Sequence, residues 1–110
     1  MAVPRPISEP TAQVIAAHLQ AIGQPVRIRL LDQLERAGEQ SVGGLARALD
    51  QSPYNTSQHL AALYRAGAVV RHRRGREVWY GLADETVPAI YELVGRRLAE
   101  LSAQRRWAGE

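Results

Sequence analysis

Cysteine is absent from the 110-residue sequence, and histidine occurs only three times. Without a thiol the chain cannot form disulfides, thiolate metal sites or iron–sulfur clusters, and it cannot sense oxidants through sulfur chemistry. Catalytic signatures are missing as well, because there is no GxSxG, no phosphate-binding loop and no HExxH. We therefore expect a protein that is not an enzyme and that holds no cofactor.

Long apolar runs are also absent. No stretch approaches the roughly 18 consecutive apolar residues of a membrane-spanning helix, and the N-terminal MAVPRPISEP lacks the apolar core of a signal peptide. The sequence therefore predicts a cytoplasmic protein with no membrane partner. A chain of this length, 45% hydrophobic, fits one globular domain with one core.

Lysine is missing, so all 14 basic residues are arginine. Between residues 51 and 76 there are five arginines and no acidic residue, whereas the rest of the chain has nine arginines and eleven carboxylates. The net positive charge therefore belongs to this one segment, whose arginines are Arg65, Arg71, Arg73, Arg74 and Arg76. Such a local patch attracts a polyanion to one face of a protein. The alternative is an ordinary solvated run of charge.

Apolar residues at helical spacing predict about five helices, near residues 11–22, 24–38, 41–49, 52–67 and 86–107. Thr11, Ser41 and Ser52 are the expected N-caps. The second helix, with Leu30 and Leu34 on one face, is the expected centre of the core. We assign residues 1–10 to a disordered arm and residues 11–107 to a single domain.

The pattern changes from helical to alternating after Gly67. The stretch AVVRHRRGREVWYGL predicts two strands joined by a turn at Arg74 and Gly75. Val78, Tyr80 and Leu82 are expected to face the core, and Arg76, Glu77 and Trp79 to face solvent or a partner. Two short helices followed by a basic hairpin predict a mainly α fold, a winged helix-turn-helix with one two-stranded β-hairpin as the wing.

The fourth helix carries polar residues where better helix formers were available. Tyr54, Asn55, Ser57 and Gln58 occupy its first turns, and Leu60, Leu63 and Tyr64 follow at inward spacing. A recognition helix needs this arrangement, because its front end meets base edges in the major groove while its later residues face the core. The alternative is that Ser52 is only an N-cap and the other polar residues are merely solvated.

Two segments, AIGQPVRIRLLDQL and LDQSPYNTSQHLAALYRAGAVVRHRRGREVWYGL, carry a family pattern. They resemble the A-L-G-D-P-T-R-L-R-I-L signature and the S-x-x-x-V-S-x-H-L block of the ArsR/SmtB winged helix-turn-helix regulators. The likeness runs from about Leu19 to Asp84. It implies a sequence-specific transcriptional regulator that binds double-stranded DNA as a homodimer, on a pseudo-palindromic operator. Pro53, Tyr54 and Asn55 depart from the usual residues, so the operator sequence cannot be inherited.

The resemblance also assigns residues to sites. It implies DNA contacts for Tyr54, Asn55, Ser57, Gln58, His59, Arg71, Arg73, Arg74 and Arg76. His59 has two interpretations, as a phosphate contact or as a hydrogen-bonded packing residue. In this family the first and last helices, here 11–22 and 86–107, form the dimer interface, and the apolar stripe of the last helix is longer than so small a core can bury. The interface residues expected are Val14, His18, Ile22, Val87, Ile90, Val94, Leu98 and Leu101.

The ligand that would control DNA binding, the effector, is less well defined by the sequence. Many relatives bind metal through a Cys-rich third helix or a His/Asp/Glu set on the last helix, but here the third helix lacks thiol and imidazole and the last offers only carboxylates. Zinc and nickel favour nitrogen and sulfur ligands, so we predict no metal site. The alternatives are a metal-linked regulator, for example of nickel or zinc, with a weak site using His18 or His72, or a separate sensing partner protein. A winged module that binds protein or RNA also remains open.

Overall fold

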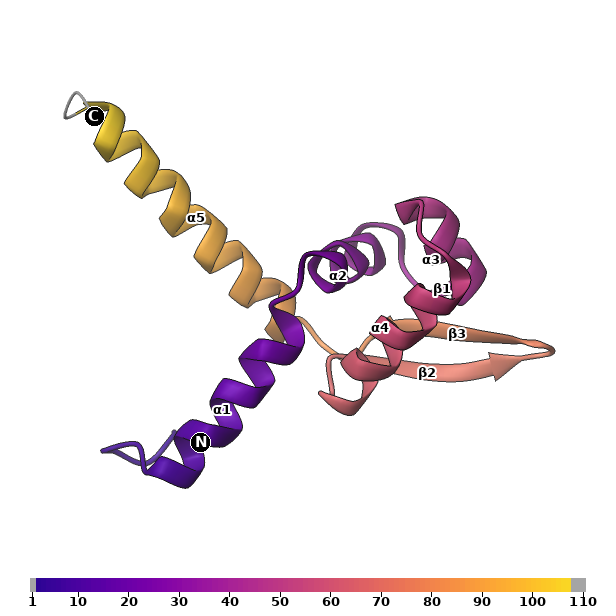
Figure 1. The fold of residues 1–110 in the computed structure, drawn as a ribbon, viewed down its shortest axis with the longest axis horizontal. Helices are drawn as coiled ribbons and strands as arrows, with labels where there is room; N and C mark the ends of the chain where they lie inside the picture. The colour runs from indigo at the N-terminus through magenta and orange to yellow at the C-terminus, as the bar shows by residue number, and fades with distance from the viewer. Residues whose placement is uncertain (1, 108–110) are drawn as a thin grey trace.

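The computed structural model describes residues 2–107 and is drawn as a ribbon in Figure 1. Within these residues the elements follow in the order α1 (Glu9–Ile22), α2 (Pro25–Ala37), β1 (Gln40–Ser41), α3 (Val42–Leu49), α4 (Pro53–Arg65), β2 (Val69–Arg74), β3 (Glu77–Leu82) and α5 (Thr86–Trp107). The predicted winged helix-turn-helix architecture is therefore confirmed. None of the helices in the described part of the chain combines the length and the apolar composition that a membrane crossing requires.

Serine side chains begin three of the helices. The Oγ atoms of Ser41 and Ser52 accept the backbone N–H of Gly44 and Asn55, each at 3.0 Å, as predicted for α3 and α4. The cap of α1 is Ser8 and not Thr11, because Ser8 Oγ accepts the Thr11 N–H at 3.3 Å. Helix α1 therefore begins at Glu9, so that residues 9 and 10 are helical and do not belong to a disordered arm.

Residues 50–52 connect α3 to α4. Asp50 adopts the left-handed conformation, with φ 54° and ψ 49°, and its backbone N–H bonds to Arg47 O at 3.3 Å. Aspartate tolerates this conformation better than most non-glycine residues because its short polar side chain bonds locally. The turn sends the chain directly into the Ser52 cap, so that α4 crosses the body beside α3.

The sheet has one more strand than predicted. Its order is β1-β3-β2, all antiparallel, with Gln40 opposite Tyr80 and Ser41 opposite Trp79. A two-residue strand is too short to produce an alternating pattern, which explains why the sequence did not predict it. In the hairpin Arg74 pairs with Glu77, so the turn residues are Gly75 and Arg76, one position later than expected. Gly75 has φ 61°, a conformation that glycine adopts without strain.

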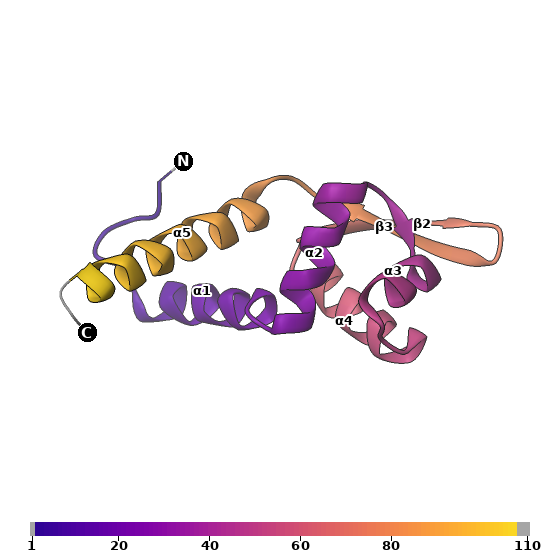
Figure 2. The same ribbon diagram turned by 90° about the horizontal axis from the view of Figure 1, so that it is seen from above.

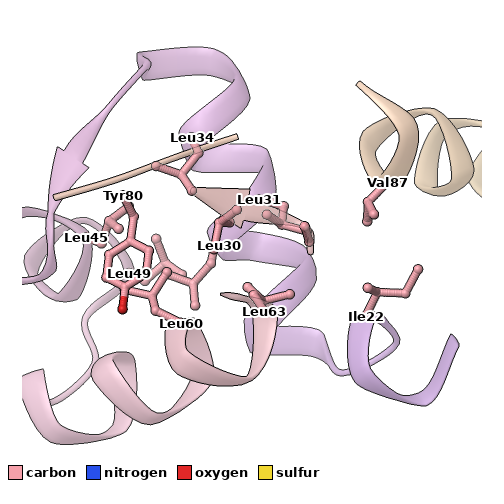
Figure 3. Packing of buried hydrophobic residues seen from close by; sticks show 12 residues of the cluster. Ile22, Leu30, Leu31, Leu34, Leu45, Leu49, Leu60, Leu63, Tyr80 and Val87 are labelled. Carbon is pink, nitrogen blue, oxygen red and sulfur yellow. The ribbon is translucent and has the colours of Figure 1, made fainter. Parts of the chain in front are cut away.

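Helix α2 lies at the centre of the core, as predicted. Leu30, Leu31 and Leu34 are fully buried, and leucines of α3 and α4 and Tyr80 of β3 pack around them, as Figure 3 shows. One prediction of side-chain orientation is wrong, because Tyr64 is 42% exposed and does not point inward. Trp79 lies on the face of the hairpin opposite Tyr80, as predicted, but it is half-buried.

Helices α1 and α5 extend away from this core. In Figures 1 and 2 they leave the body on the side opposite the hairpin tip, and in Figure 1 they diverge from one another. At their base Ile22 and Val87 point toward each other (Figure 3), and the Tyr91 hydroxyl donates a hydrogen bond of 2.6 Å to the Ile22 carbonyl. The molecule is consequently elongated and flat, with extents of 54 × 38 × 21 Å.

Candidate nucleic-acid interface

The front end of α4 is anchored by a threonine. Thr56 is fully buried, and its hydroxyl donates to the Ser52 carbonyl at 2.9 Å. With Thr56 pointing inward, helical geometry turns its neighbours Tyr54, Asn55, Ser57 and Gln58 outward, and all four are exposed. Tyr54 is 71% exposed, an unusual position for an aromatic ring without a partner. The four predicted reading residues therefore form one polar surface.

The strand β2 lies beside α4, and alternate residues of β2 point to opposite faces of the sheet. Arg71 and Arg73 are opposite Tyr80 and Val78, on the face that meets α4. The Arg71 guanidinium lies over the Tyr64 ring, 3.9 Å from its centroid. A groove of about 480 Å³ runs between the two elements, and Ser57, Arg71 and Arg73 are among the residues that line it.

The tip of the hairpin reaches the front end of α4. Arg76 lines a second recess, of about 400 Å³, together with Pro53 and Ser57. The structure thus brings three of the four predicted wing arginines to the same side as the polar surface of α4. Arginine side chains beside a groove of this kind are suited to phosphate groups, which they bind through a planar fork of donors.

Arg74 lies on the other face of the hairpin. Its Nη2 donates to Glu39 Oε1 at 2.7 Å, its Nε donates to His72 Nε2 at 3.0 Å, and its guanidinium lies 4.3 Å from the centroid of the Trp79 ring. Glu39 also lies 3.6 Å from His72 Nδ1. Arg74 is therefore neutralised within the protomer. Sequence reasoning missed Glu39, because 35 residues separate it from Arg74 and no pattern connects them.

Of the two interpretations of His59, the structure agrees with that of a hydrogen-bonded packing residue. It is half-buried, and its Nδ1 accepts a hydrogen bond from Arg27 Nε at 3.1 Å. Burial and, secondly, the Arg27 charge lower the pKa of His59 below its ordinary value of 6.5. The neutral imidazole that accepts at Nδ1 carries its proton on Nε2. This nitrogen remains a hydrogen-bond donor, one helical turn from Asn55.

The predicted interface residues on α1 and α5 fall into two groups. Val14, Val94 and Leu98 are exposed, whereas His18, Ile90 and Leu101 are half-buried. Ile22 and Val87 are only 2% and 4% exposed and belong to the protomer's own core, so their assignment to a dimer interface is corrected. Leu93 is 63% exposed and was not predicted. An apolar groove of about 430 Å³, lined by Leu19, Ile90 and Val94 among others, lies between the two helices.

Carboxylates gather in a cavity of about 550 Å³ between α2 and α5, lined in part by Asp32, Glu35, Glu85 and Glu92. A hydrogen bond with Glu85, followed by burial and by neighbouring negative charge, raises the pKa of Glu35. Across residues 2–107, however, no three His, Cys, Asp or Glu side chains are arranged to hold a metal ion. The cavity supplies only oxygen ligands and no imidazole.

Known proteins share both the sequence pattern and the fold. The model of a helix-turn-helix domain family matches residues 22–72. A transcriptional repressor SmtB homolog from Synechocystis is 38% identical over 98 residues, covering 88% of this chain and 73% of the relative. The crystal structure of Rv0081 from M. tuberculosis superposes with a TM-score of 0.78 and 30% identity, covering 89% and 98% of the two chains.

A second solved structure is described as a homodimer. It is the winged helix-turn-helix DNA-binding domain Mb0332 from Mycobacterium bovis, with a TM-score of 0.73, 28% identity and coverage of 91% of this chain and 92% of that one. The family model is confined to residues 22–72, whereas the relative and the two solved structures each cover close to nine-tenths of this chain. The chain therefore belongs to the ArsR/SmtB family of winged helix-turn-helix transcriptional regulators.

Proposed function

We propose that this protein regulates transcription by binding a pseudo-palindromic operator as a homodimer. The observation that carries the proposal is the shared surface of α4 and the hairpin, where exposed polar side chains lie beside arginines that line the same grooves. The front half of α4 enters the major groove, and the hairpin follows the adjacent backbone. The chain acts by binding and not by catalysis.

Residues of this surface have two tasks. The side-chain amides of Asn55 and Gln58 can each form two hydrogen bonds with an adenine base. The hydroxyl groups of Tyr54 and Ser57 can bind base edges or phosphates. Arg73 and Arg76 neutralise phosphates, and Arg71, supported by the Tyr64 ring, does so from the inner part of the groove. His59 donates from Nε2. Arg74 contributes only after its ion pair with Glu39 opens.

Dimerisation supplies the two-fold symmetry of the operator. A single protomer leaves several apolar side chains of α1 and α5 in water, among them Val14, Leu93, Val94 and Leu98. A second copy covers them when the two α5 helices pack together. The solved structure from M. bovis, which is described as homodimeric, supports a homodimer. The two α4 helices then present themselves to half-sites about one helical turn apart.

Selection of bound sequences from random or genomic DNA tests the proposal. We expect enrichment of two inverted half-sites, and a dissociation constant that rises steeply with salt. Gln58→Ala should cost about 1–3 kcal/mol at particular base pairs while leaving the salt dependence nearly unchanged. Gln104→Ala, an exposed glutamine on α5, is the matched control.

Two results would count against the proposal. One is the absence of any enriched DNA sequence, together with retention of RNA or of a protein partner. The other is a Gln58→Ala variant that weakens binding to every sequence equally, which would mean that α4 does not read bases.

A further inference from the structure

The C-terminal end of α1 is fastened to two other helices. The last carbonyl groups of a helix have no partner within it and need donors from elsewhere. Here Arg27 Nη1 on α2 donates to the Ala21 carbonyl at 2.9 Å, and the Tyr91 hydroxyl on α5 donates to the Ile22 carbonyl at 2.6 Å. Burial raises the pKa of Tyr91 to about 12, so this donor keeps its proton. Both bonds are partly buried.

The same guanidinium group reaches the recognition helix. While Nη1 of Arg27 holds Ala21 of α1, its Nε donates to His59 Nδ1 of α4 at 3.1 Å. One side chain on α2 thus joins a predicted dimerisation helix to the predicted recognition helix. Lysine cannot replace it, because an ammonium group lacks the planar fork of donors that bonds in two fixed directions.

We propose that Arg27 is a positioning residue for DNA recognition, which fixes His59 as its Nε2–H tautomer and holds α4 at a set position relative to α1. This inference rests on the proposed function. If two protomers meet through α1 and α5, the separation of the two α4 helices depends on how rigidly each α4 is connected to its own dimerisation helices. Arg27 supplies the polar part of that connection.

The tautomer is tested first, on the free full-length protein. Nitrogen-15 NMR of the histidine rings should show His59 of the wild-type protein with an unprotonated Nδ1 and a protonated Nε2. Arg27→Met and Arg27→Lys should give a mixture of the two tautomers, because neither side chain donates to Nδ1 in the same geometry. Arg29→Met removes an exposed arginine two positions further along α2 and should leave the His59 signals unchanged.

The separation of the recognition helices is tested with two operators, one at the selected half-site spacing and one with a single base pair inserted at the centre. We expect the wild-type dimer to discriminate between them, and the ratio of the two dissociation constants to fall about tenfold in Arg27→Met, which corresponds to about 1.4 kcal/mol. A residue that only stabilised the fold would weaken binding to both operators alike. Arg27→Lys should resemble Arg27→Met, and Arg29→Met should resemble the wild-type protein.

The outcomes separate this inference from the proposed function. If Arg27→Lys keeps both the Nε2–H tautomer and the spacing preference, positive charge alone is sufficient and the positioning role is wrong. If Arg27→Met does not fold, as circular dichroism would reveal, Arg27→Lys decides the question. A wild-type protein that binds neither operator contradicts the proposed function, while the tautomer measurement, made without DNA, still tests the Arg27–His59 contact.

Discussion

Individual arginine side chains differ in how much of their charge is available to DNA. Arg74 is paired with Glu39 and stacked on Trp79, and Arg71 is stacked on Tyr64, which leaves its charge unneutralised. Arg73 and Arg76 have no ion pair within residues 2–107 and line the grooves beside α4. Arg27 is half-buried and is hydrogen-bonded to Ala21 and His59. The same residue type therefore serves phosphate binding, wing structure and helix positioning.

The pH dependence of the free energy of unfolding should report the protonation state of His59. Its pKa is lowered in the folded protein, so below pH 6.5 the unfolded chain takes up a proton that the folded chain resists. The free energy of unfolding should therefore fall as the pH decreases from 6.5 through the lowered pKa, and the contribution of His59 should be fully present above 6.5.

Urea denaturation of the wild-type protein and of His59→Gln, at intervals between pH 7.5 and pH 5, measures this contribution. The stability of the wild-type protein should decrease more than that of the variant as the pH falls. His18 and His72 are present in both proteins, so their contributions cancel in the difference. Parallel curves would show that His59 is not kept neutral by its surroundings.

At the scale of elements, the hairpin has two faces with different roles. The face with Arg71 and Arg73 meets α4, and the opposite face carries Arg74, His72 and Trp79 against Glu39. Trp79 Nε1 is buried without a hydrogen-bond partner among the described residues, beside the guanidinium of Arg74. The ion pair between Arg74 and Glu39 is exposed, and an exposed ion pair stabilises a protein by about 1 kcal/mol at most. It can therefore open when phosphates compete for the arginine.

Removing the Glu39 carboxylate should release Arg74 for DNA. We expect Glu39→Gln to bind the operator more tightly at low salt, and the slope of log K against log salt to steepen by about 2 units, one additional phosphate contact from each protomer. Glu92→Gln removes the same charge from α5, on the other side of the body from the hairpin in Figure 1, and is the control.

Anisotropy titrations over a range of salt concentrations measure both quantities. If Glu39→Gln and Glu92→Gln have equal effects, Glu39 acts only through the net charge of the protein. If Arg74→Ala leaves the slope of the Glu39→Gln protein unchanged, the released arginine does not reach a phosphate.

At the scale of the whole molecule, we expect a second copy to cover the parts of α1 and α5 that extend away from the core. A chain of this size has little core, and the outer parts of α1 and α5 extend beyond it (Figure 2). Val14, Val94 and Leu98 on these two helices are exposed. We expect the double substitution Val94→Glu with Leu98→Glu to give a folded monomer. Burying a valine or leucine side chain contributes about 1.5–3 kcal/mol. A dimer buries Val94 and Leu98 from both protomers, and their combined contribution is comparable with the binding free energy of about 8 kcal/mol that a micromolar dissociation constant represents.

Size-exclusion chromatography with light scattering measures the oligomeric state, and circular dichroism checks the fold. Arg96→Glu makes the same change in charge on the opposite side of α5 and should remain dimeric. A doubly substituted protein that stays dimeric at micromolar concentration would place the interface elsewhere.

Release from DNA should not follow the addition of metal or thiol reagents. The chain has no thiol to modify, and its third and last helices lack imidazole, so any affinity for zinc, nickel, cobalt or copper should be micromolar or weaker, about −8 kcal/mol at best. A weakly held ion has little differential free energy with which to shift the protein between its bound and free conformations. Titration of each metal into the protein–DNA complex, followed by anisotropy, measures this. Stoichiometric release that His18→Ala or His72→Ala abolishes would reveal a metal site.

Local chemistry in the sequence was sufficient to predict the helices and the hairpin. The caps Ser41 and Ser52, the end of α4 two residues before Gly67 and the change from helical to alternating spacing each depend on residues within a few positions of one another. The exposed polar front of α4 follows from the same short-range periodicity. For this reason the helix-turn-helix and most of the candidate DNA surface could be predicted.

Contacts between distant residues were decided only by the tertiary structure. The pairing of Glu39 with Arg74, the short strand β1 and the bonds from Arg27 to Ala21 and His59 join elements that no periodicity connects. Burial is likewise a property of the packed molecule. Ile22 and Val87 are core residues, whereas Tyr64, which has the spacing of an inward-facing residue of α4, is exposed. A pattern gives the face of a helix, but packing determines how far along that face the core extends.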